Sequence, residues 1–323
     1  MNKAIVFSQL GGPEVLRWTE VSLPKPARGE AVVRAHAIGV NYIDTYQRSG
    51  LYKMPLPFVP GSEGAGEVVA VGPGVTDFKV GDRGAYAGAL GGYADERVMP
   101  ADRLVKLPDS IDYNTGAAMM LQGMTVRYLL KQTYKVGPGT TVLLHAAAGG
   151  IGLIASKWAK HLGATVIGTT SSADKMELAK AHGCTHVINY KTEDFVKRTK
   201  ELTNGQGVDV VYDGVGKDTY PGSLDCLKPL GLWVSFGNAS GPIANFDFGM
   251  LAAKGSLYAT RPTLNTYTAK RADLVENANE LFDVVKKGTV KIPINQTYAL
   301  KDAAKAQSDL ESRKTTGTTV LIP

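Results

Sequence analysis

The feature that most constrains the fold is a glycine-rich turn between an expected strand and an expected helix, in the stretch LLHAAAGGIGLIASKWAKHLGATVIGTT. Ala147, Gly149 and Gly152 form an AxGxxG pattern. A glycine at 149 would let the backbone approach a pyrophosphate, and a glycine at 152 would let the helix pack closely on the strand. The alanine at 147 indicates that this turn does not need a positive φ.

The residues after the turn predict an amphipathic helix. Ile151, Ile154, Trp158 and Leu162 recur at helical spacing, and Gly163 supplies a stop. A second strand, ATVIGTT, follows. This context favours a dinucleotide site over a plain tight turn, with the anion at the helix N-terminus, where unpaired amides and the helix dipole favour negative charge.

The end of the second strand distinguishes the two nicotinamide dinucleotides. A site for NAD usually has Asp or Glu there, whereas the 2′-phosphate of NADP needs donors and positive charge. This chain has the hydroxyl run TTSS at 169–172 and then Lys175. Asp174 falls in the first turn of the next helix, where a carboxylate offsets the dipole. We therefore predict NADPH, although Lys175 could also be an ordinary solvated helix residue.

The periodicity of the chain changes twice. Residues 1–121 consist of short alternating strands separated by glycine and proline, which predicts a mostly β domain. Residues 122–261 alternate apolar strands with helical segments, which predicts a parallel sheet covered on both faces. Residues 262–323 begin with a polar helix and end in the strand GTTVLIP, which we expect to fold back onto the first domain. The predicted fold class is α/β, a Rossmann doubly wound parallel sheet plus a mostly β domain.

Composition narrows the functional classes. A length of 323 residues favours two domains, and no apolar run approaches the ~20 residues of a membrane span. The N-terminus lacks the pattern of a secretory signal, so we expect a cytoplasmic protein. Cys184 and Cys226 are too few for a disulfide scaffold or a zinc site and are expected to be inert, partly buried thiols. The net charge of +6 comes from scattered Lys and Arg, so we expect a solvated surface rather than a nucleic-acid face.

Several motifs spread along the chain carry a resemblance to a known family. They are GGPEVL, AIGVNYIDTYQRSGLY, PGSEGAGEVVAVGPGV with GDR, HAAAGGIG, VSFGNASG, SLYATRP and LESRKTTG. With these motifs nearly the whole chain resembles the medium-chain dehydrogenase/reductase superfamily, and within it the zinc-independent NADPH:quinone oxidoreductases related to ζ-crystallin. The resemblance implies that the β domain is GroES-like.

The resemblance also bears on metal chemistry. Zinc members of the superfamily have a cysteine where this chain has Asn41, and a histidine where it has Ser62. Amide and hydroxyl groups are poor replacements for thiolate and imidazole as zinc ligands, so we expect no metal. Glu63 is interpreted as structural, with a nearby arginine as its partner.

In this family a reduced nicotinamide lies in a dry cleft between the domains, and hydride transfer to a quinone needs positioning more than a strong acid. The resemblance implies that Asn41 and Tyr46 lie near the nicotinamide and Tyr52 near the substrate, and these are the candidate catalytic residues. A tyrosine hydroxyl could donate to the developing quinone oxyanion. The tyrosines could equally be packing residues between the domains.

The family resemblance supplies most of the cofactor contacts, and Tyr190, which ends the next expected strand, could either cover the adenine or phosphate side or be a plain strand-end residue. The candidate contacts are Asn41, Tyr46, Tyr128, Gly149, Gly150, Ile151, Ser171, Lys175, Tyr190, Phe236, Gly237, Asn238, Ser240, Arg261 and Arg313. His145 precedes the turn on an expected buried strand and is interpreted as a core histidine.

The predicted function is NADPH-dependent, metal-free reduction of quinones. A reductase of the C=C bond of alkenals and enones would need the same cofactor and a similar site, so it remains an alternative. A binding protein for nucleic acid, or a structural crystallin-like protein, is an alternative of another class. We also expect a homodimer that pairs through the edge of the nucleotide-binding sheet, with LWVSFG and SLYATR as suitable edge strands.

Overall fold

The computed structural model describes residues 1–323 and divides into two compact units, each of which is described by itself. The first unit comprises residues 1–124, 267–286 and 292–323, and the second comprises residues 125–266 and 287–291. None of the helices has the length and apolar character that a membrane span requires.

A six-stranded sheet with the order β10-β9-β8-β11-β12-β13 forms the centre of the second unit. All its neighbouring strands are parallel. The strands are β8 (Thr141–Leu144), β9 (Thr165–Thr170), β10 (His186–Asn189), β11 (Val208–Asp213), β12 (Leu227–Ser235) and β13 (Tyr258–Thr260). Since the order runs outward in both directions from β8, this is the doubly wound Rossmann topology. The predicted fold class is confirmed.

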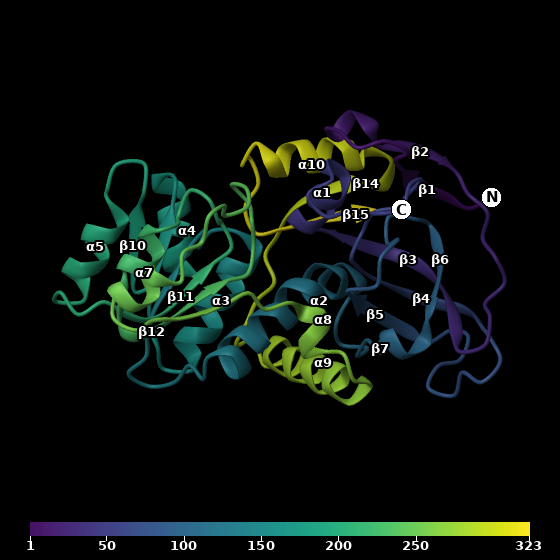
Figure 1. Ribbon diagram of the computed structural model, residues 1–323. Helices are drawn as coiled ribbons and strands as arrows, with labels where there is room; N and C mark the ends of the chain where they lie inside the picture. The colour runs from purple at the N-terminus through teal and green to yellow at the C-terminus, as the bar shows by residue number, and fades with distance from the viewer. The chain divides into compact units, whose positions relative to one another are not determined.

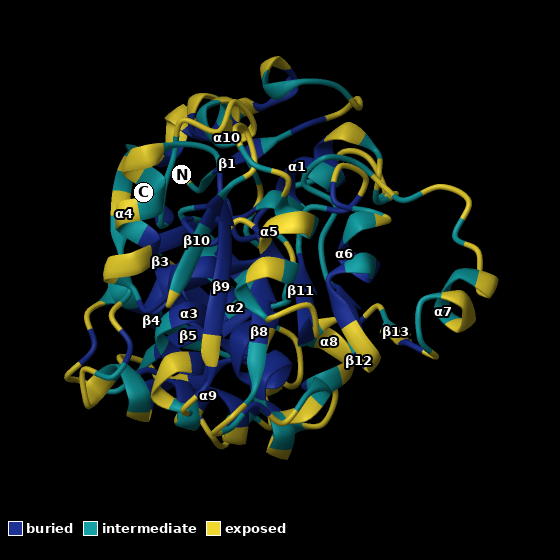
Figure 2. Ribbon diagram, turned by 90° about the vertical axis from the view of Figure 1, so that its left-hand side faces the viewer, coloured by how far each residue is buried: buried dark blue, intermediate teal, exposed yellow.

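Helices lie on both faces of this sheet (Figure 1), and its central strands β8, β9 and β11 are mostly buried. The helices are α3 (Gly150–His161), α4 (Ala173–Ala181), α5 (Phe195–Leu202), α6 (Gly222–Asp225), α7 (Gly249–Ala253) and the π-helix η3 (Leu129–Thr133). The ribbon of β9 is dark blue over most of its length in Figure 2, and five of its six residues are buried. Two-sided burial explains why these strands appear in the sequence as continuous apolar runs.

The first unit contains a seven-stranded sheet with the order β14-β15-β3-β4-β5-β7, in which β6 also pairs with β3, and a two-stranded sheet of β1 and β2. Its strands are β1 (Lys3–Val6), β2 (Arg17–Glu20), β3 (Glu30–Val40), β4 (Glu63–Val71), β5 (Arg83–Ala87), β6 (Glu96–Pro100), β7 (Val105–Lys106), β14 (Ile294–Ala299) and β15 (Thr318–Ile322). The C-terminal strand β15 pairs antiparallel with β3. The end of the chain therefore does return to the N-terminal β structure.

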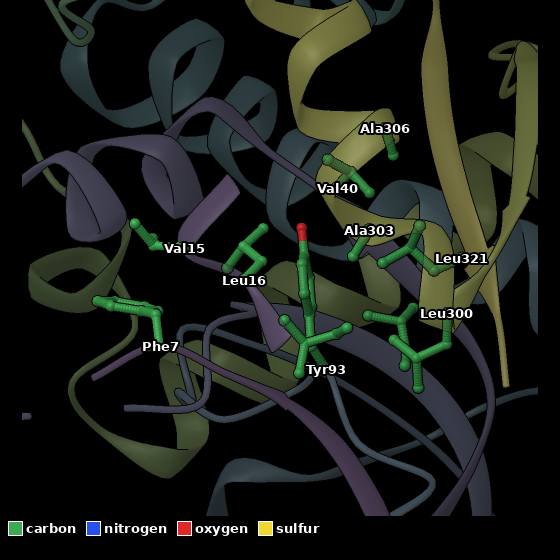
Figure 3. Packing of buried hydrophobic residues seen from close by; sticks show 11 residues of the cluster. Phe7, Val15, Leu16, Val40, Tyr93, Leu300, Ala303, Ala306 and Leu321 are labelled. Atoms are coloured by element: carbon green, nitrogen blue, oxygen red, sulfur yellow. The ribbon is translucent and has the colours of Figure 1, made fainter. Parts of the chain in front are cut away.

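Helices and apolar side chains close the first unit around its sheet. The helical segments are η1 (Pro13–Val15), α1 (Tyr42–Ser49), η2 (Ala101–Arg103), α2 (Tyr113–Tyr128), α8 (Leu264–Tyr267), α9 (Arg271–Lys286), η4 (Leu300–Asp302) and α10 (Ala303–Glu311), of which α2 and α8 include residues of both units. Figure 3 shows one core cluster, in which the Tyr93 ring lies among Leu16, Ala303 and Leu321. This packing fixes the Tyr93 hydroxyl inside the unit.

One expectation about the sheet is wrong. The segment LWVSFG lies in β12, which pairs with β11 on one side and β13 on the other, so it is not an edge strand. The edges are β10 and β13, and β13 carries the segment SLYATR. Both segments are short apolar runs, so the sequence could not distinguish the interior strand from the edge strand.

Candidate active site

The turn from β8 to α3 has the close packing that its glycines predict. A Cβ on Gly152 would lie 2.4 Å from the Ala146 carbonyl oxygen, so only glycine fits there. A Cβ on Gly149 would meet only that same oxygen, at 3.3 Å, which leaves the other side of the turn open. No side chain caps the N-terminus of α3. The turn thus offers an open backbone cradle with uncapped amides, which suits an anion.

One detail of the turn corrects the sequence interpretation. Ala147 does not have a positive φ, but its neighbour Ala146 does, with φ 55°. The turn therefore requires one left-handed residue, displaced by one position from the alanine of the AxGxxG pattern. An alanine in this conformation carries a steric cost of roughly 1–2 kcal/mol.

The second-unit candidates are brought together by the parallel sheet. Gly149, Gly150 and Ile151 follow β8, Ser171 and Lys175 follow β9, and Tyr190 follows β10; the group Phe236, Gly237, Asn238 and Ser240 follows β12, and Arg261 follows β13. The carboxyl ends of parallel strands meet at one edge of the sheet, where α/β proteins bind their ligands. The exception is Tyr128, which is the last residue of α2 and is buried.

Backbone hydrogen bonds join neighbouring strand ends at this edge. The Ala147 amide donates to the Thr169 carbonyl at 3.0 Å, and the Tyr190 amide donates to the Thr170 carbonyl at 3.1 Å. The Thr170 hydroxyl is buried and has no hydrogen-bond partner in the protein. A buried unpaired hydroxyl beside an open cradle is the kind of group that a polar ligand satisfies.

The start of α4 has Asp174 in its first turn, as the sequence predicts. Ser172 caps the helix, since its hydroxyl accepts from the Lys175 amide at 3.4 Å. No acid follows β9 at the position where a site for NAD would place one. The end of β9 therefore has no Asp or Glu that would compete with a phosphate for Lys175.

Arg261 ties the β12 loop to β13. Its guanidinium donates to the Ser235 carbonyl at 2.9 Å and to the Gly237 carbonyl at 3.0 Å. In the amide orientation that satisfies both neighbours, Asn238 donates to Gly237 and accepts from Arg261, each at 3.0 Å. Arg261 thus holds the loop in addition to any contact with a ligand.

In the first unit, Asn41 is buried at the start of α1 and its side chain is held from both sides. Its amide nitrogen donates to Glu63 at 2.7 Å, and its amide oxygen accepts from Gln122 at 3.1 Å. Its backbone amide donates to Asp44 at 2.9 Å, which completes a capping box. Asn41 therefore has one fixed orientation.

The candidate tyrosines of this unit pack against one another. The rings of Tyr46 and Tyr52 meet edge to face with centroids 5.4 Å apart, and Tyr42 lies 6.2 Å from Tyr46. The Tyr52 amide also donates to the Tyr46 carbonyl at 3.0 Å. The structure thus brings Tyr46 and Tyr52 together in one cluster. Another candidate cofactor contact of this unit, Arg313, lies just beyond α10 with a positive φ of 60°.

Glu63 contradicts its predicted pairing, because its partners are not arginines. Its carboxyl group accepts from Asn41 and, at 2.7 Å, from the Leu121 amide. Burial raises the pKa of Glu63 to about 8, and the charge of Asp44 adds to this effect. Burial likewise raises the pKa of Asp44 to about 6, against hydrogen bonds from Asn41, Tyr93 and Ser62. The partners come from distant parts of the chain, which sequence spacing does not reveal.

Comparison with known proteins places the chain in a family. Residues 27–109 match the alcohol dehydrogenase GroES-like domain, and residues 150–278 match the zinc-binding dehydrogenase family. The chain is 53 % identical to a quinone oxidoreductase of Pseudomonas aeruginosa, over 100 % of both chains. The chain belongs to the quinone oxidoreductase family.

Two further relatives of this family bear on ligands. The crystal structure of Escherichia coli quinone oxidoreductase complexed with NADPH has a TM-score of 0.98 and 50 % identity, over 99 % of this chain and 100 % of that one. A 2-haloacrylate reductase of Burkholderia is 47 % identical, over 100 % of this chain and 99 % of the relative. The predicted membership in the family, and with it the prediction of an oxidoreductase, is confirmed.

This quinone oxidoreductase family member matches a family named for zinc, yet its own residues at the zinc-ligand positions are otherwise engaged. Asn41 donates to Glu63, and the Ser62 hydroxyl donates to Asp44 at 3.0 Å. The chain contains no group of three or more His, Cys, Asp or Glu side chains that could hold a metal ion. Hydrogen bonds between amide, hydroxyl and carboxyl groups fill these positions.

The interpretation of His145 as a core residue agrees with the structure, and the two cysteines, which were expected to be partly buried, are buried. His145 is buried, and its ring nitrogens lie 3.0 Å from the Thr169 hydroxyl and 3.1 Å from the Ser223 hydroxyl. Burial lowers the pKa of His145. Burial also raises the pKa of the Cys184 thiol to about 11 and that of Cys226 to about 12, so both thiols are inert.

The sequence interpretation missed two buried acids, Asp213 and Asp44, and the charge of Asp44 acts on Glu63. Asp213 ends β11 and is fully buried among hydrogen-bond donors, and Asp44 and Glu63 form the acidic pair of the first unit. The sequence did contain a signal for Asp213. In VVYDGVG an Asp follows an apolar strand and precedes a glycine, which places a polar residue at the edge of the sheet where ligands bind. Asp44 had no comparable signal in the sequence.

Proposed function

We propose that this chain catalyses the NADPH-dependent, metal-free reduction of quinones by hydride transfer. The observation that carries the proposal is 50–53 % identity over the full length to quinone oxidoreductases, one of which has been crystallised with NADPH. When bound, NADPH supplies the hydride. The protein's task is to hold the cofactor and the acceptor in reacting geometry and to exclude water.

Residues of the second unit fit NADPH. The open backbone at Gly149 and the uncapped start of α3 suit the pyrophosphate. Ser171 and Lys175 would hold the 2′-phosphate, and the unpaired Thr170 hydroxyl would gain a partner. We propose as further contacts Asn41, Tyr46, Tyr128, Gly150, Ile151, Tyr190, Phe236, Gly237, Asn238, Ser240, Arg261 and Arg313.

A charge test distinguishes the cofactors. Lys175→Ala is expected to raise the KM for NADPH about tenfold and to leave the KM for NADH nearly unchanged, because only NADPH carries the 2′-phosphate. Lys180→Ala on the same helix, where Lys180 pairs with Glu177 at 2.9 Å, is the control. Equal effects of Lys175→Ala on the two cofactors would refute the 2′-phosphate role.

For the reaction itself we propose that Asn41, Tyr46 and Tyr52 act at the reacting end of the cofactor. Asn41 has a fixed amide, and the two tyrosines present hydroxyls within one cluster. A hydroxyl that donates to the oxyanion developing on a quinone would lower the barrier. The assay follows NADPH absorbance with 1,4-benzoquinone and larger naphthoquinones. No oxidation of NADPH by any quinone would overturn the proposal.

The similarity to 2-haloacrylate reductase supports a second candidate, reduction of the C=C bond of alkenals and enones. Both reactions deliver a hydride to a conjugated acceptor, so the same residues serve either. An enone added to the quinone panel ranks the two by kcat/KM. A higher value for the enone would make the double bond the preferred acceptor.

We propose functional domains of residues 1–121 with 262–323, which act on the substrate, and residues 122–261, which bind NADPH. We also propose a cytoplasmic homodimer. The edge strand β13 carries Tyr258, which is 61 % exposed, and would otherwise present unpaired backbone groups to solvent. The two cysteines are free and buried, which suits a reducing compartment. Sedimentation velocity measures the oligomeric state, and a monomer would refute the dimer.

A further inference from the structure

The carboxylate of Asp213 is the most heavily hydrogen-bonded side chain at the ligand-binding edge of the second unit. Asp213 ends β11 and has no exposed surface. One oxygen accepts from the Val215 amide at 2.9 Å and the Gly216 amide at 3.1 Å. The other accepts from the Ser223 hydroxyl at 2.8 Å and the Trp233 indole at 3.3 Å. The Thr219 hydroxyl lies within 2.9 Å of both oxygens.

These bonds fix the shape of the loop over residues 214–219. Two consecutive amides and one hydroxyl of the loop converge on the same carboxylate, and the Thr219 amide donates back to the Gly216 carbonyl at 3.1 Å. Gly216 has a φ of 92°, which side chains rarely adopt. The carboxylate thus holds the loop in a conformation that needs glycine.

This loop in turn holds the loop over residues 236–241. The Ser240 amide and hydroxyl both donate to the Val215 carbonyl at 2.9 Å, and the Ser240 hydroxyl accepts from the Asp218 amide at 2.9 Å. A Cβ on Gly237 would lie 2.4 Å from the Gly214 carbonyl oxygen. The two loops are therefore in direct backbone contact, and a shift of the first displaces the second.

A third connection leads to the phosphate turn. The Ser223 hydroxyl that donates to Asp213 lies 3.1 Å from Nε2 of His145, and Nδ1 of His145 lies 3.0 Å from the Thr169 hydroxyl. A neutral ring with its proton on Nε2 satisfies both contacts. His145 directly precedes the turn. One carboxylate thus links the ends of β8, β9, β11 and β12.

We propose that Asp213 is a positioning residue for NADPH, which acts by holding the 214–219 loop so that the 236–241 loop keeps its cofactor-binding shape. The inference rests on the proposed function, because it assumes that residues of the 236–241 loop contact NADPH. Asp213 itself is buried under these loops and touches no ligand. Asp213 holds the loops in their binding shape before NADPH binds, so the cost of ordering them is not subtracted from the binding free energy.

Thr219 allows a test that leaves the carboxylate in place. Thr219→Val removes the hydroxyl and keeps the shape, so one charge-assisted hydrogen bond is lost. We expect the Kd of NADPH, measured by fluorescence titration without turnover, and the KM for NADPH to rise about tenfold. The kcat and the quinone KM should change less than twofold. Thr219→Ser restores the hydroxyl and should bind NADPH within twofold of the wild type.

A matched control separates positioning from stability. Thr203 has a hydroxyl that accepts from the Gly207 amide at 2.9 Å, next to the amino end of β11 and so away from the strand ends discussed here. Thr203→Val should lower the Tm and leave the Kd of NADPH unchanged. If Thr219→Val lowers the Tm but leaves the Kd within twofold of the wild type, or if Thr219→Ser is as impaired as Thr219→Val, the proposal is wrong.

Two further outcomes are decisive. If Thr219→Val does not fold, Ser223→Ala replaces it, since it removes a second donor to the same carboxylate, and an unchanged Kd for that variant overturns the proposal. Failure of the proposed function is recognised separately, because the wild type would then not bind NADPH in the titration or would not oxidise it with any acceptor of the panel.

Discussion

The two units each bury acidic side chains, but the environments shift the pKa values in opposite directions. In the second unit burial alone would raise the pKa of Asp213, yet the charge of His145 and hydrogen bonds from Gly216, Thr219 and Ser223 lower it below its usual range. In the first unit burial raises the pKa of Glu63 to about 8, and two hydrogen bonds do not compensate. Both side chains are fully buried. Burial is equally deep at both sites, so the neighbouring charge and the hydrogen-bond donors around each carboxyl group decide whether it is charged.

The arrangement of neighbours explains the difference. Asp213 draws five donors from residues 215–233. Glu63 shares its surroundings with Asp44, whose charge raises its pKa further. Burial lowers the pKa of His145, so its charge acts on Asp213 only in acid, where Asp213 itself titrates. At neutral pH the donors therefore stabilise the Asp213 carboxylate.

Removing the Asp213 carboxylate, which has more hydrogen-bond donors than Glu63, is expected to have the largest effect on stability. Asp213→Ala removes the shared acceptor of five donors, of which the Thr219 hydroxyl keeps a second acceptor in the Gly216 carbonyl at 2.9 Å. We expect the free energy of unfolding in urea to fall by about 3 to 5 kcal/mol. Asp283→Ala is the control, since Asp283 is 58 % exposed and pairs with Lys286 at 3.6 Å. The control should change stability by less than about 0.5 kcal/mol. A similar small change for Asp213→Ala would mean that the donors are satisfied without the carboxylate.

The raised pKa of Glu63 in the first unit predicts that the stability of the protein depends on pH. Folded Glu63 retains its proton up to about pH 8, because its pKa is raised to that value, whereas in the unfolded chain it has the ordinary glutamate pKa of 4.5. Stability therefore falls as pH rises through this window. Glu63→Gln does not titrate, so its stability relative to the wild type should rise across the window by at most about 5 kcal/mol.

Unfolding free energies of the wild type and Glu63→Gln at intervals from pH 4.5 to 8.5 measure this difference. Glu67→Gln, a half-buried position on the same strand, is the control and should run parallel to the wild type. Asp44 titrates in all three proteins, but its charge acts on Glu63 only where Glu63 is present, so this coupling is part of the measured difference. Parallel curves for Glu63→Gln and the wild type would show that Glu63 is ionised throughout and that its donors outweigh its burial.

The sequence predicted local features of the fold well. The strands, the turn at Gly149 and Gly152 and the helix that follows depend on residues within a few positions of one another, and spacing reveals such relations. The parallel direction of the strands and the helices on both faces of the sheet followed from the alternation of strands and helices. The edge was wrong at β12, because whether a strand has one neighbour or two depends on where the later strand β13 pairs.

The site was only partly predictable for the same physical reason. The candidate residues after β8 and β9 could be proposed because a phosphate turn and a missing acid are local signals. Glu63 was given an arginine partner, whereas its partners are 22 and 58 residues away in the sequence. Asp213 went unnoticed although its donors are close in sequence, because a strand-end Asp has no fixed spacing to the groups it binds.

The smallest effect is expected at the far end of a chain of hydrogen bonds that leads to Glu63. The Thr318 hydroxyl donates to Gln122 at 3.1 Å, Gln122 donates to Asn41, and Asn41 donates to Glu63, so every bond in the chain points toward the carboxyl group. Thr318→Val keeps the shape of the buried strand residue but removes the first donor. We expect a loss of about 1 kcal/mol in unfolding free energy. Thr318→Ser should recover most of it; if the serine variant is no more stable than the valine variant, the hydroxyl does not support the chain, and the donor supply to Glu63 begins at Gln122.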